Sequence, residues 1–319
     1  MSRILITGAA GNLGSLLARR LLTTKQQLRL MVHRRPLADD LAEAPSVEVV
    51  TADLDLPETL GPACAEVGTI VHFAGVLFRP WPERFLPRTN LQFFQNLVDA
   101  ALTAGVGKII LISFPHVEGQ TTPDDPARGR LDRKPTSVHA QTRLEEERYL
   151  LARCDGTATT PVVLRVGMVY GPGVLMIETA RWLLQRRLLA VWPRPTGIHL
   201  IAKEDFLTAT EAAIFTDAAA GIYHLGDDQP LTLQEFLDRL ADRLGYPRPW
   251  RLPWAVIYLV SLAVEIFATV FRTQAPLTRD FIRIGSSSYC GDNSRMKQEL
   301  LPDLSYPTIA EGLLQFGEA

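Results

Sequence analysis

The first 170 residues of the chain alternate between short apolar runs and longer stretches in which apolar residues recur every three or four positions. Runs of the first kind predict buried strands, and stretches of the second kind predict helices with one apolar face. This alternation is typical of an α/β fold with a doubly wound parallel sheet and helices on both faces. The expected strands are Ile4–Thr7, Leu28–His33, Val47–Thr51, Thr69–Phe73, Lys108–Ser113 and Pro161–Val166, and the expected helices lie near Asn12–Leu22, Arg88–Ala104 and Ser137–Ala152.

Beyond Gly171 the pattern becomes irregular and richer in proline and aromatic residues. We therefore expect a smaller C-terminal substrate-binding region that is interleaved with the main domain. Gly197–Ile201 and Ile222–Leu225 are expected to be strands that return to the main sheet, with a helix at Asp205–Phe215 between them. The main domain would then comprise residues 1–170 and 197–225, and the substrate-binding region residues 171–196 and 226–319.

One stretch, Leu252–Phe271, is apolar over about the length needed to cross a membrane. It contains one carboxylate, Glu265, which would be costly to place in lipid, and it is flanked by Arg248, Arg251 and Arg272. The pattern allows a buried or substrate-covering helix pair, a helix lying on a membrane surface, or a membrane span. The first alternative is favoured, and the second leaves peripheral membrane contact open.

Composition and charge narrow the classes of function. The 319 residues suffice for one large domain or two, and the net charge of −2 creates no field that would attract nucleic acid. Three scattered cysteines, Cys64, Cys154 and Cys290, fit a reducing compartment and predict neither a disulfide framework nor a metal site. The chain opens on an expected strand and not on a signal segment, so we expect a cytoplasmic protein, with membrane association through residues 252–271 as the alternative.

The most informative motif follows the first expected strand, where glycines recur at Gly8, Gly11 and Gly14 and a helix begins. In a dinucleotide site the first glycine permits a tight turn, the second lets the backbone approach a pyrophosphate, and the third lets helix and strand pack closely. The helix N-terminus then presents free N–H groups and its positive dipole end to the anion. Strand, glycines and helix in this order predict a cofactor-binding loop made of Gly8, Ala10, Gly11, Asn12, Leu13 and Gly14.

The spacing Thr-Gly-x-x-Gly-x-x-Gly resembles the short-chain dehydrogenase/reductase superfamily, specifically its extended branch of NAD(P)-dependent epimerases, dehydratases and 3β-hydroxysteroid-dehydrogenase-like enzymes. The run from Leu164 to Pro172 is similar to the segment that closes over the nicotinamide in this family, and Asn90 and Asp205 also match its pattern. The resemblance covers nearly the whole chain and implies a Rossmann-like fold. It further implies cofactor contacts from Asp53 and Leu54 near the adenine, from Phe73, Ala74 and Gly75 near the ribose and pyrophosphate, and from Ile112, Val166 and Met168.

The end of the second strand bears on the choice of cofactor. An acidic residue there would bind the ribose 2′-hydroxyl and select NAD, but this strand ends in His33, Arg34 and Arg35, with no carboxylate before Asp39. Arginine can pair with a 2′-phosphate through two hydrogen bonds. We therefore expect NADP(H), bound with the help of His33 and Arg34, and keep NAD(H) as the alternative.

The catalytic positions depart from the family pattern. The resemblance implies a Tyr and a Lys four residues apart on one helix, a spacing that puts both on one face, and a Ser or Thr after the fifth strand. The matching positions hold His139, Arg143 and Phe114, with Ser113 directly before Phe114. Arg143 could bind the nicotinamide ribose, and His139 could exchange a proton with the substrate, although a nearby arginine would lower its pKa. The candidate catalytic residues are His139, Arg143 and Ser113, and His116 is a second candidate for proton transfer.

Two classes of function remain open. The first is an atypical NADP(H)-dependent oxidoreductase that acts on a small hydrophobic carbonyl or alcohol substrate, as the apolar C-terminal stretch suggests. The second is a non-catalytic NADP(H)-binding sensor or assembly protein, which the missing Tyr–Lys pair favours. A nucleotide-sugar epimerase or dehydratase is less favoured because that chemistry relies on the tyrosine. The resemblance also allows a homodimer through the helices near Arg88–Ala104 and Ser137–Ala152.

Overall fold

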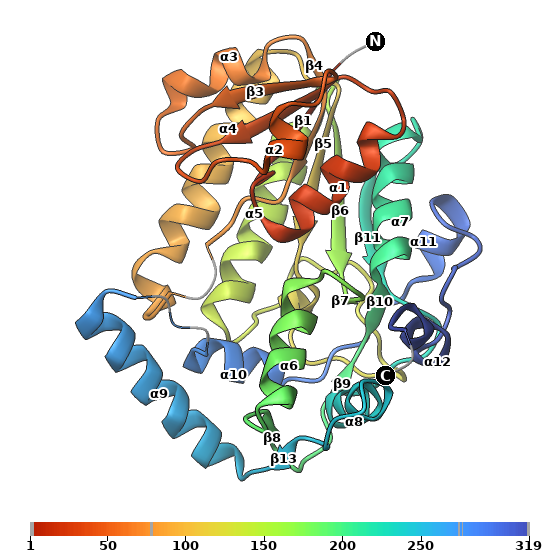
Figure 1. Ribbon diagram of the computed structural model, residues 1–319. Coiled ribbons are helices and arrows are strands. Elements are labelled where there is room, and N and C mark those ends of the chain that lie inside the picture. The colour runs from red at the N-terminus through yellow and green to blue at the C-terminus, as the bar shows by residue number, and fades with distance from the viewer. Residues whose placement is uncertain (1–2, 77–78, 274, 276, 318–319) are drawn as a thin grey trace.

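A seven-stranded parallel sheet forms the centre of the protein in the computed structural model, which describes residues 3–76, 79–273, 275 and 277–317 (Figure 1). The strand order is β11-β6-β5-β4-β1-β2-β3, so the chain starts in the middle of the sheet, runs to one edge and then reverses past β1. Doubly wound sheets bind ligands at such a reversal, beyond the carboxyl ends of the strands. The strands are β1 (Arg3–Thr7), β2 (Leu28–Val32), β3 (Val47–Thr51), β4 (Val67–His72), β5 (Lys108–Ser113), β6 (Thr160–Val166) and β11 (Gly221–Leu225).

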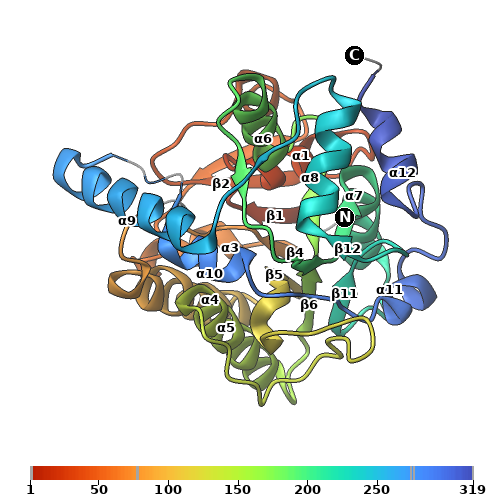
Figure 2. The same ribbon diagram turned by 90° about the horizontal axis from the view of Figure 1, so that it is seen from below.

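Helices cover both faces of this sheet, which is why its central strands are apolar at successive positions (Figures 1 and 2). In β5, for example, Ile109, Ile110 and Leu111 are all fully buried. Ile110 belongs to the core beneath one helical layer, while Ile109 and Leu111 belong to the core beneath the other. One layer contains α1 (Asn12–Leu22), α2 (Asp39–Ala42) and α7 (Lys203–Phe215), and the other contains α3 (Leu60–Cys64), α4 (Phe93–Thr103) and α5 (Val138–Cys154).

The expected α/β class and parallel sheet are therefore confirmed, with strand and helix bounds close to those expected. The largest local difference lies at Arg88–Ala104, expected as one helix. Its first part, Pro87–Gln92, has the wider π-helical winding, and α4 begins only at Phe93.

The C-terminal region lies beyond the carboxyl ends of the strands and is built from short strands and helices (Figure 2). Its strands pair in twos, β10 with β7, β12 with β9 and β13 with β8. Its elements are β7 (Met168–Tyr170), α6 (Leu175–Gln185), β8 (Ala190–Val191), β9 (Gly197–Ile198), β10 (Leu200–Ala202), β12 (Leu231–Thr232), α8 (Leu233–Arg243), β13 (Trp250–Arg251), α9 (Trp254–Phe271), α10 (Arg279–Gly285), α11 (Ser294–Glu299) and α12 (Ile309–Gly312).

The expectation that Gly197–Ile201 returns to the main sheet is wrong. The stretch divides into β9, which pairs antiparallel with β12, and β10, which pairs parallel with β7. The edge position beside β6 is already occupied by β11, the stretch expected as Ile222–Leu225, and this strand does join the main sheet. A single apolar run can satisfy its backbone in either sheet, so its hydrophobic pattern could not decide between them.

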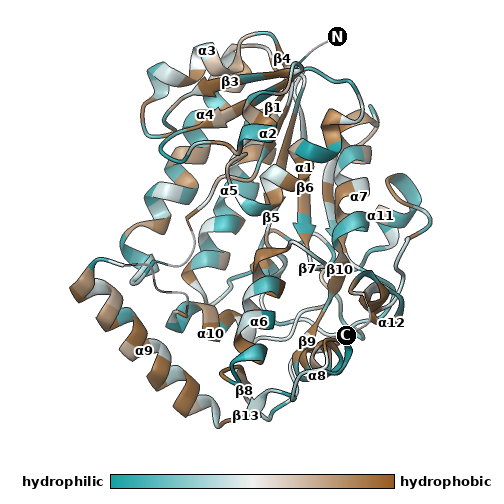
Figure 3. Ribbon diagram, in the orientation of Figure 1, coloured by the Kyte–Doolittle hydropathy of each residue, from teal (hydrophilic) through white to brown (hydrophobic). Residues whose placement is uncertain are grey.

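The favoured interpretation of Leu252–Phe271 was a buried or substrate-covering helix pair. The expectations of burial and of two helices are wrong, whereas a role in covering substrate stays a prediction. Residues 254–271 form one unbroken helix, α9, and 22% of its residues are buried. Neither glycine nor proline follows Pro253 within the stretch, so nothing divides it into two helices. In Figure 3 this helix lies at the lower left and is coloured as hydrophobic over most of its length.

Candidate active site

The glycine loop between β1 and α1 has the tight geometry expected of a dinucleotide site. Gly8 has a φ of +71°, and the N–H of Gly11 donates to the Gly8 carbonyl oxygen at 2.8 Å. A Cβ atom on Gly14 would lie 2.5 Å from that same oxygen, so only glycine lets α1 start this close to the loop. A Cβ on Gly8 would lie 2.8 Å from the backbone nitrogen of Ala74, which shows that the segment Phe73-Ala74-Gly75 runs directly beside the loop.

The N-terminus of α1 is left open for an anion. Its N-cap is Gly11, no side chain caps its N–H groups, and its first turn holds no acidic residue. The side chain of Asn12 points instead to the segment after β7, where its amide nitrogen donates to the Gly173 carbonyl at 2.8 Å and its oxygen accepts from the Leu175 N–H at 2.9 Å. Asn12 therefore ties this segment to the helix start, and the backbone N–H groups remain the anion donors.

The expected adenine end gathers at the ends of β2 and β3. His33 Nε2 lies 3.1 Å from Asp53 Oδ2, and the other oxygen of Asp53 accepts the Asp55 N–H at 3.0 Å. Arg34 is exposed, and among the described residues no carboxylate pairs with it. The structure thus brings His33 and Asp53 together as expected and leaves the Arg34 guanidinium available to a ligand.

Arg143 reaches from α5 to the end of β4. A Cβ on Gly75 would lie 2.5 Å from Arg143 Nη2, so the guanidinium lies against this glycine. The same guanidinium pairs at 2.7 Å with Glu146, which is fully buried. Burial raises the pKa of Glu146 although Arg143 opposes that shift, and burial together with the Arg143 charge lowers the pKa of His72 to about 3. This end of the site therefore holds the Arg143 guanidinium in a fixed position, between its ion-pair partner Glu146 and a neutral His72.

His139 lies one turn before Arg143, in the first turn of α5. Ser137 caps this helix by accepting the Ala140 N–H at 3.0 Å, and the Asp280 carboxylate of α10 accepts the backbone N–H groups of Val138 and His139. The His139 ring meets the Phe114 ring edge to face, with centroids 4.9 Å apart. Burial, and after it the charge of Arg143, lower the pKa of His139 to about 3, so its imidazole is neutral at pH 7.

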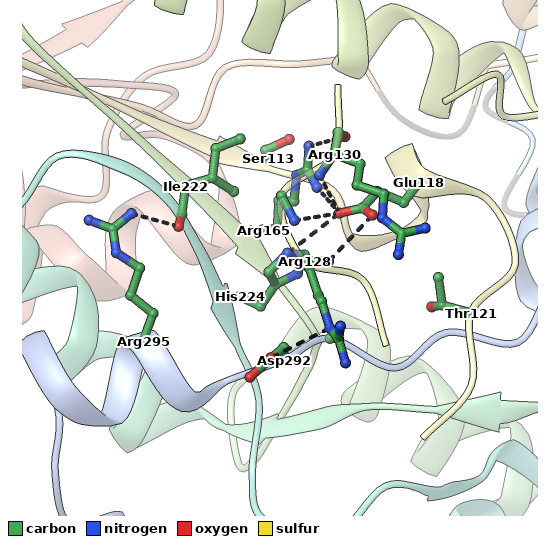
Figure 4. A network of polar contacts seen from close by, with 12 residues as sticks. Ser113, Glu118, Thr121, Arg128, Arg130, Arg165, Ile222, His224, Asp292 and Arg295 are labelled. Carbon is green, nitrogen blue, oxygen red and sulfur yellow. Dashed lines mark hydrogen bonds and ion pairs between the residues drawn. The ribbon is translucent and has the colours of Figure 1, made fainter. Parts of the chain in front are cut away.

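Ser113 faces a different network. Its hydroxyl donates to the buried carboxylate of Glu147, which also pairs at 2.6 Å with Arg165, a side chain with no exposed area. Figure 4 shows Arg165 also reaching Glu118, whose carboxylate accepts the backbone N–H groups of Gly129 and Arg130 at 2.7 and 3.0 Å. Ser113 thus contacts the charges that fasten the segment after β5 to the sheet, and its catalytic role stays a prediction.

Other expected residues have structural partners. His116 Nε2 lies 3.0 Å from the Ser287 carbonyl, and burial lowers the pKa of His116 to about 4. Asn90 donates to the Thr142 hydroxyl at 3.0 Å. Asp205 is fully buried and accepts the N–H groups of Ser305 and Tyr306, so it fastens the C-terminal segment to α7.

The remaining expected cofactor contacts lie where the strands end. Ile112 is the last residue but one of β5, and Val166 is the last residue of β6. Met168 is the first residue of β7, and Leu54 lies in the loop that follows β3.

The residues that sequence reasoning missed are Glu146, Glu147 and Asp280. The run Glu145-Glu146-Glu147 offered a signal, because an acidic run beside an expected site arginine invites pairing, whereas nothing in the sequence links Asp280 to a helix start far earlier in the chain.

These residues fit a nicotinamide dinucleotide. The backbone at Gly8 and Gly14 leaves no room for a side chain, which lets a ligand approach the loop closely. No side chain caps the N-terminus of α1, and the Arg143 guanidinium lies against Gly75. Among the described residues, no group of three or more His, Cys, Asp or Glu side chains is placed to hold a metal ion.

Comparison with known proteins places this fold and loop in a family. The model of the NAD dependent epimerase/dehydratase family matches residues 4–190, more than half of the chain. The chain belongs to this family. The glycine loop and the sheet order independently indicate the NAD(P)-binding Rossmann fold of this family.

Individual relatives within this family are distant. Uronate dehydrogenase of Pseudomonas putida is 26% identical over 247 residues, which cover 77% of this chain and 83% of the relative. 2-Alkyl-3-oxoalkanoate reductase of Stenotrophomonas maltophilia is 27% identical over 265 residues, which cover 77% of each chain. The solved structure of MoeE5 with UDP-glucuronic acid and NAD has a TM-score of 0.76 at 21% identity, covering 98% of this chain and 97% of that chain, and this likeness shows the fold.

Proposed function

We propose that this family member is an NADP(H)-dependent oxidoreductase that acts on a small hydrophobic carbonyl or alcohol, with His139 and Arg143 in the places of the usual Tyr and Lys. The observation that carries the proposal is the approach of the Arg143 guanidinium to Gly75, directly beside the glycine loop. A cation at this point can bind the ribose hydroxyls of a nicotinamide nucleotide. The names of the two relatives, a uronate dehydrogenase and a 2-alkyl-3-oxoalkanoate reductase, support redox chemistry at a carbon–oxygen bond.

The bound nucleotide would supply or accept the hydride. Within the chain, Arg143 holds the ribose and places its positive charge beside the reacting centre, where Glu146 fixes its orientation. His139 acts as a neutral imidazole, because its pKa of about 3 rules out a useful supply of imidazolium at pH 7. A ring N–H of His139 then donates a hydrogen bond that polarises the substrate carbonyl, and water delivers the proton; neutral histidine is known to polarise carbonyls in this way.

The preference for NADP(H) rests on Arg34, which is exposed beside His33 and has no acidic partner among the described residues. Titration with NADPH and NADH, followed by nicotinamide fluorescence, tests it. We expect NADPH to bind at least tenfold more tightly, a difference of about 1.4 kcal/mol. Arg34→Ala should remove most of this difference, while Arg248→Ala, which changes an exposed arginine paired with Asp242, should leave it unchanged. Equal binding of both nucleotides by the wild type would contradict the preference.

The catalytic assignment is tested by NADPH oxidation with a panel of apolar ketones and oxoacids. We expect His139→Phe to lower kcat about 10²-fold while the NADPH dissociation constant stays unchanged, since the imidazole contacts the substrate and not the nucleotide. Arg143→Ala should weaken NADPH binding itself. Full activity of His139→Phe would remove this residue from the mechanism.

A second function, NADP(H) binding without turnover, is favoured by one observation. The His139 ring packs against Phe114, and the Asp280 carboxylate accepts backbone N–H groups at the start of α5. The residue at the position of the family's catalytic tyrosine therefore makes packing contacts that a purely structural role would also explain. NADPH binding at micromolar concentration without turnover of any compound in the panel would support this function. Turnover of one compound would exclude it.

A further inference from the structure

Helix α9 carries its large apolar side chains on its outer side and its one carboxylate on its inner side, whereas a helix at the surface of a water-soluble protein turns its charged residues outward. The residues that face the protein are Ile257, Ser261, Glu265 and Ala268, so its only charged side chain points inward. The large side chains on the outer side are all apolar and reach exposures of 62% at Leu259 and 68% at Val270. Trp254, Val256, Val260, Ile266, Phe267 and Phe271 complete this surface, the α9 face.

The α9 face is wide. At about 100° per residue, the inward residues occupy roughly 80° of the circumference, and the residues of the α9 face other than Trp254, which lies at the start of the helix, occupy about 140°. Among the described elements, the helix has its main packing contacts with α10 and β8, and it projects from the edge of the body, as Figure 2 shows most clearly. A soluble monomer rarely exposes a continuous apolar surface of this kind, so we expect the α9 face to be covered by another protein surface or by lipid.

Arginines and large aromatic rings surround the helix. Trp81 donates its indole N–H to Thr269 of α9 at 2.9 Å, and the guanidinium groups of Arg84 and Arg279 lie over the Trp81 ring. Arg283 donates to the Tyr258 hydroxyl at 3.3 Å, and Arg272 is exposed at the end of the helix.

The acidic groups of this neighbourhood are largely engaged. Glu265 pairs with Arg279 at 2.6 Å, and Asp280 accepts the N–H groups at the start of α5, which leaves Glu83 as the exposed carboxylate. The rim of the α9 face is therefore positive, and Trp and Tyr at such a rim are typical of the boundary between lipid and water.

We propose that α9 attaches the protein to the surface of an anionic phospholipid membrane, lying in the interface with the α9 face toward the acyl chains and its arginine rim at the headgroups. Lipid can cover an arc of about 140° along the whole helix, whereas one helix of a second copy would cover a narrower stripe. The ion pair of the buried Glu265 carboxylate with Arg279 explains why α9 lies on the membrane and does not cross it, because a span would carry this pair into lipid. The attachment does not depend on the proposed redox function.

Flotation of the full chain with phosphatidylcholine vesicles, with and without phosphatidylglycerol, tests the proposal. We expect binding that is stronger with phosphatidylglycerol and weakens with salt. Leu259→Glu combined with Phe267→Glu should lower the partition constant at least about tenfold. The matched control is Leu314→Glu, at a leucine that is 66% exposed on the far C-terminal segment, and it should bind as the wild type does. Arg84→Gln and Arg272→Gln should each weaken binding to the anionic vesicles only, by about fivefold.

A second measurement uses a tryptophan in the middle of the helix. Val260→Trp changes a side chain that is 50% exposed, so the variant should fold. Brominated lipids should quench its added fluorescence most strongly with bromine near the headgroup end of the acyl chain. Strongest quenching from the bilayer centre would mean that α9 spans the membrane, and would overturn the proposal. Absence of vesicle binding, with a dimer in lipid-free buffer that Phe267→Glu converts to a monomer, would overturn it in favour of a second copy. NADPH titration of the same samples separates either result from a failure of the redox function.

Discussion

At the residue scale, the geometry of the candidate site depends on a few close contacts between individual groups. The missing Cβ of Gly14 lets α1 begin against the Gly8 carbonyl, and one guanidinium, that of Arg143, touches both Gly75 and Glu146. Burial keeps the His139 imidazole neutral at pH 7. If His139 takes the place of the family tyrosine, as we propose, the available proton chemistry changes with it.

Gly14→Ala tests the first of these contacts. Alanine favours a helix over glycine by about 1 kcal/mol, but its Cβ would lie 2.5 Å from a backbone oxygen that cannot move freely. We expect at least tenfold weaker NADPH binding and a loss of about 1–3 kcal/mol in the free energy of unfolding. The control is Gly61→Ala in α3, where nothing lies within 4 Å and stability should be equal or higher. Nucleotide fluorescence and urea unfolding measure both, and unchanged NADPH binding by Gly14→Ala would contradict the geometry.

The neutral state of His139 predicts a pH dependence of stability. Its pKa is about 3 in the folded protein and 6.5 when unfolded, so between these values only the unfolded chain binds the proton. Relative to His139→Phe, the wild type should therefore lose up to about 1.4 kcal/mol per pH unit as the pH falls below 6.5. Urea unfolding of both proteins between neutral pH and about pH 5 measures this difference. Parallel curves would show that His139 titrates normally, and would revive it as a general acid.

At the scale of elements, two helices are placed by single carboxylates from elsewhere in the chain. The start of α5 is covered by Asp280 of α10, and α9 is held to α10 by Glu265, whose oxygens accept the Arg279 N–H at 3.0 Å and its Nε–H at 2.6 Å. Most of the apolar side chains of α9 face outward, and Ile257 and Ala268 are its buried apolar residues. We therefore expect the polar contacts of Glu265 to contribute much of what holds α9 in place.

Glu265→Ala should therefore loosen α9. Removing a carboxylate that bonds a charged partner costs about 1–3 kcal/mol, and Arg279 would keep its contacts with the Trp81 ring and the Tyr258 hydroxyl. We expect faster amide hydrogen exchange throughout α9 and a lower unfolding free energy. Arg248→Ala, which breaks the exposed pair with Asp242, should change stability by less than about 0.5 kcal/mol. Unchanged exchange in α9 would mean that apolar contacts suffice.

For the whole molecule, the buried cluster around Arg165 connects parts that the chain order separates. Arg165 on β6 bonds Glu147 of α5, Glu118 after β5 and the Arg130 carbonyl at 3.1 Å. The segment after Glu118 in turn bonds the C-terminal region, where the Thr121 hydroxyl donates to the Cys290 carbonyl at 3.0 Å. The cluster thus links the main sheet to the region that covers its carboxyl edge.

Arg165→Met should destabilise the protein globally by about 3–5 kcal/mol, because it leaves two buried carboxylates without their partner. Adding Glu118→Gln and Glu147→Gln should recover part of the loss, since the uncompensated charges are then absent. Urea unfolding followed by circular dichroism measures the unfolding free energies of the wild type, Arg165→Met and the triple variant. A loss below about 1 kcal/mol for Arg165→Met would show that the cluster contributes little net stability.

The sequence by itself determined the parallel sheet and the dinucleotide loop, and it placed His139 and Arg143 four residues apart on one helix. Each of these is a local pattern: an apolar run, a glycine spacing, or two positions on one helix. Tertiary structure alone decided the partners of the small strands β9 and β10, the burial that keeps His139 neutral, and the contacts of Arg165 and Asp280. These depend on residues far apart in the chain.

The apolar helix α9 shows most clearly what local sequence patterns cannot predict. Hydropathy located it but could not tell an inward apolar face from an outward one, because the stretch is apolar almost all round. Only packing on α10 and β8 determined which narrow stripe faces the body and left the α9 face exposed. Local patterns thus specify elements, whereas the direction in which an element faces is set by what surrounds it.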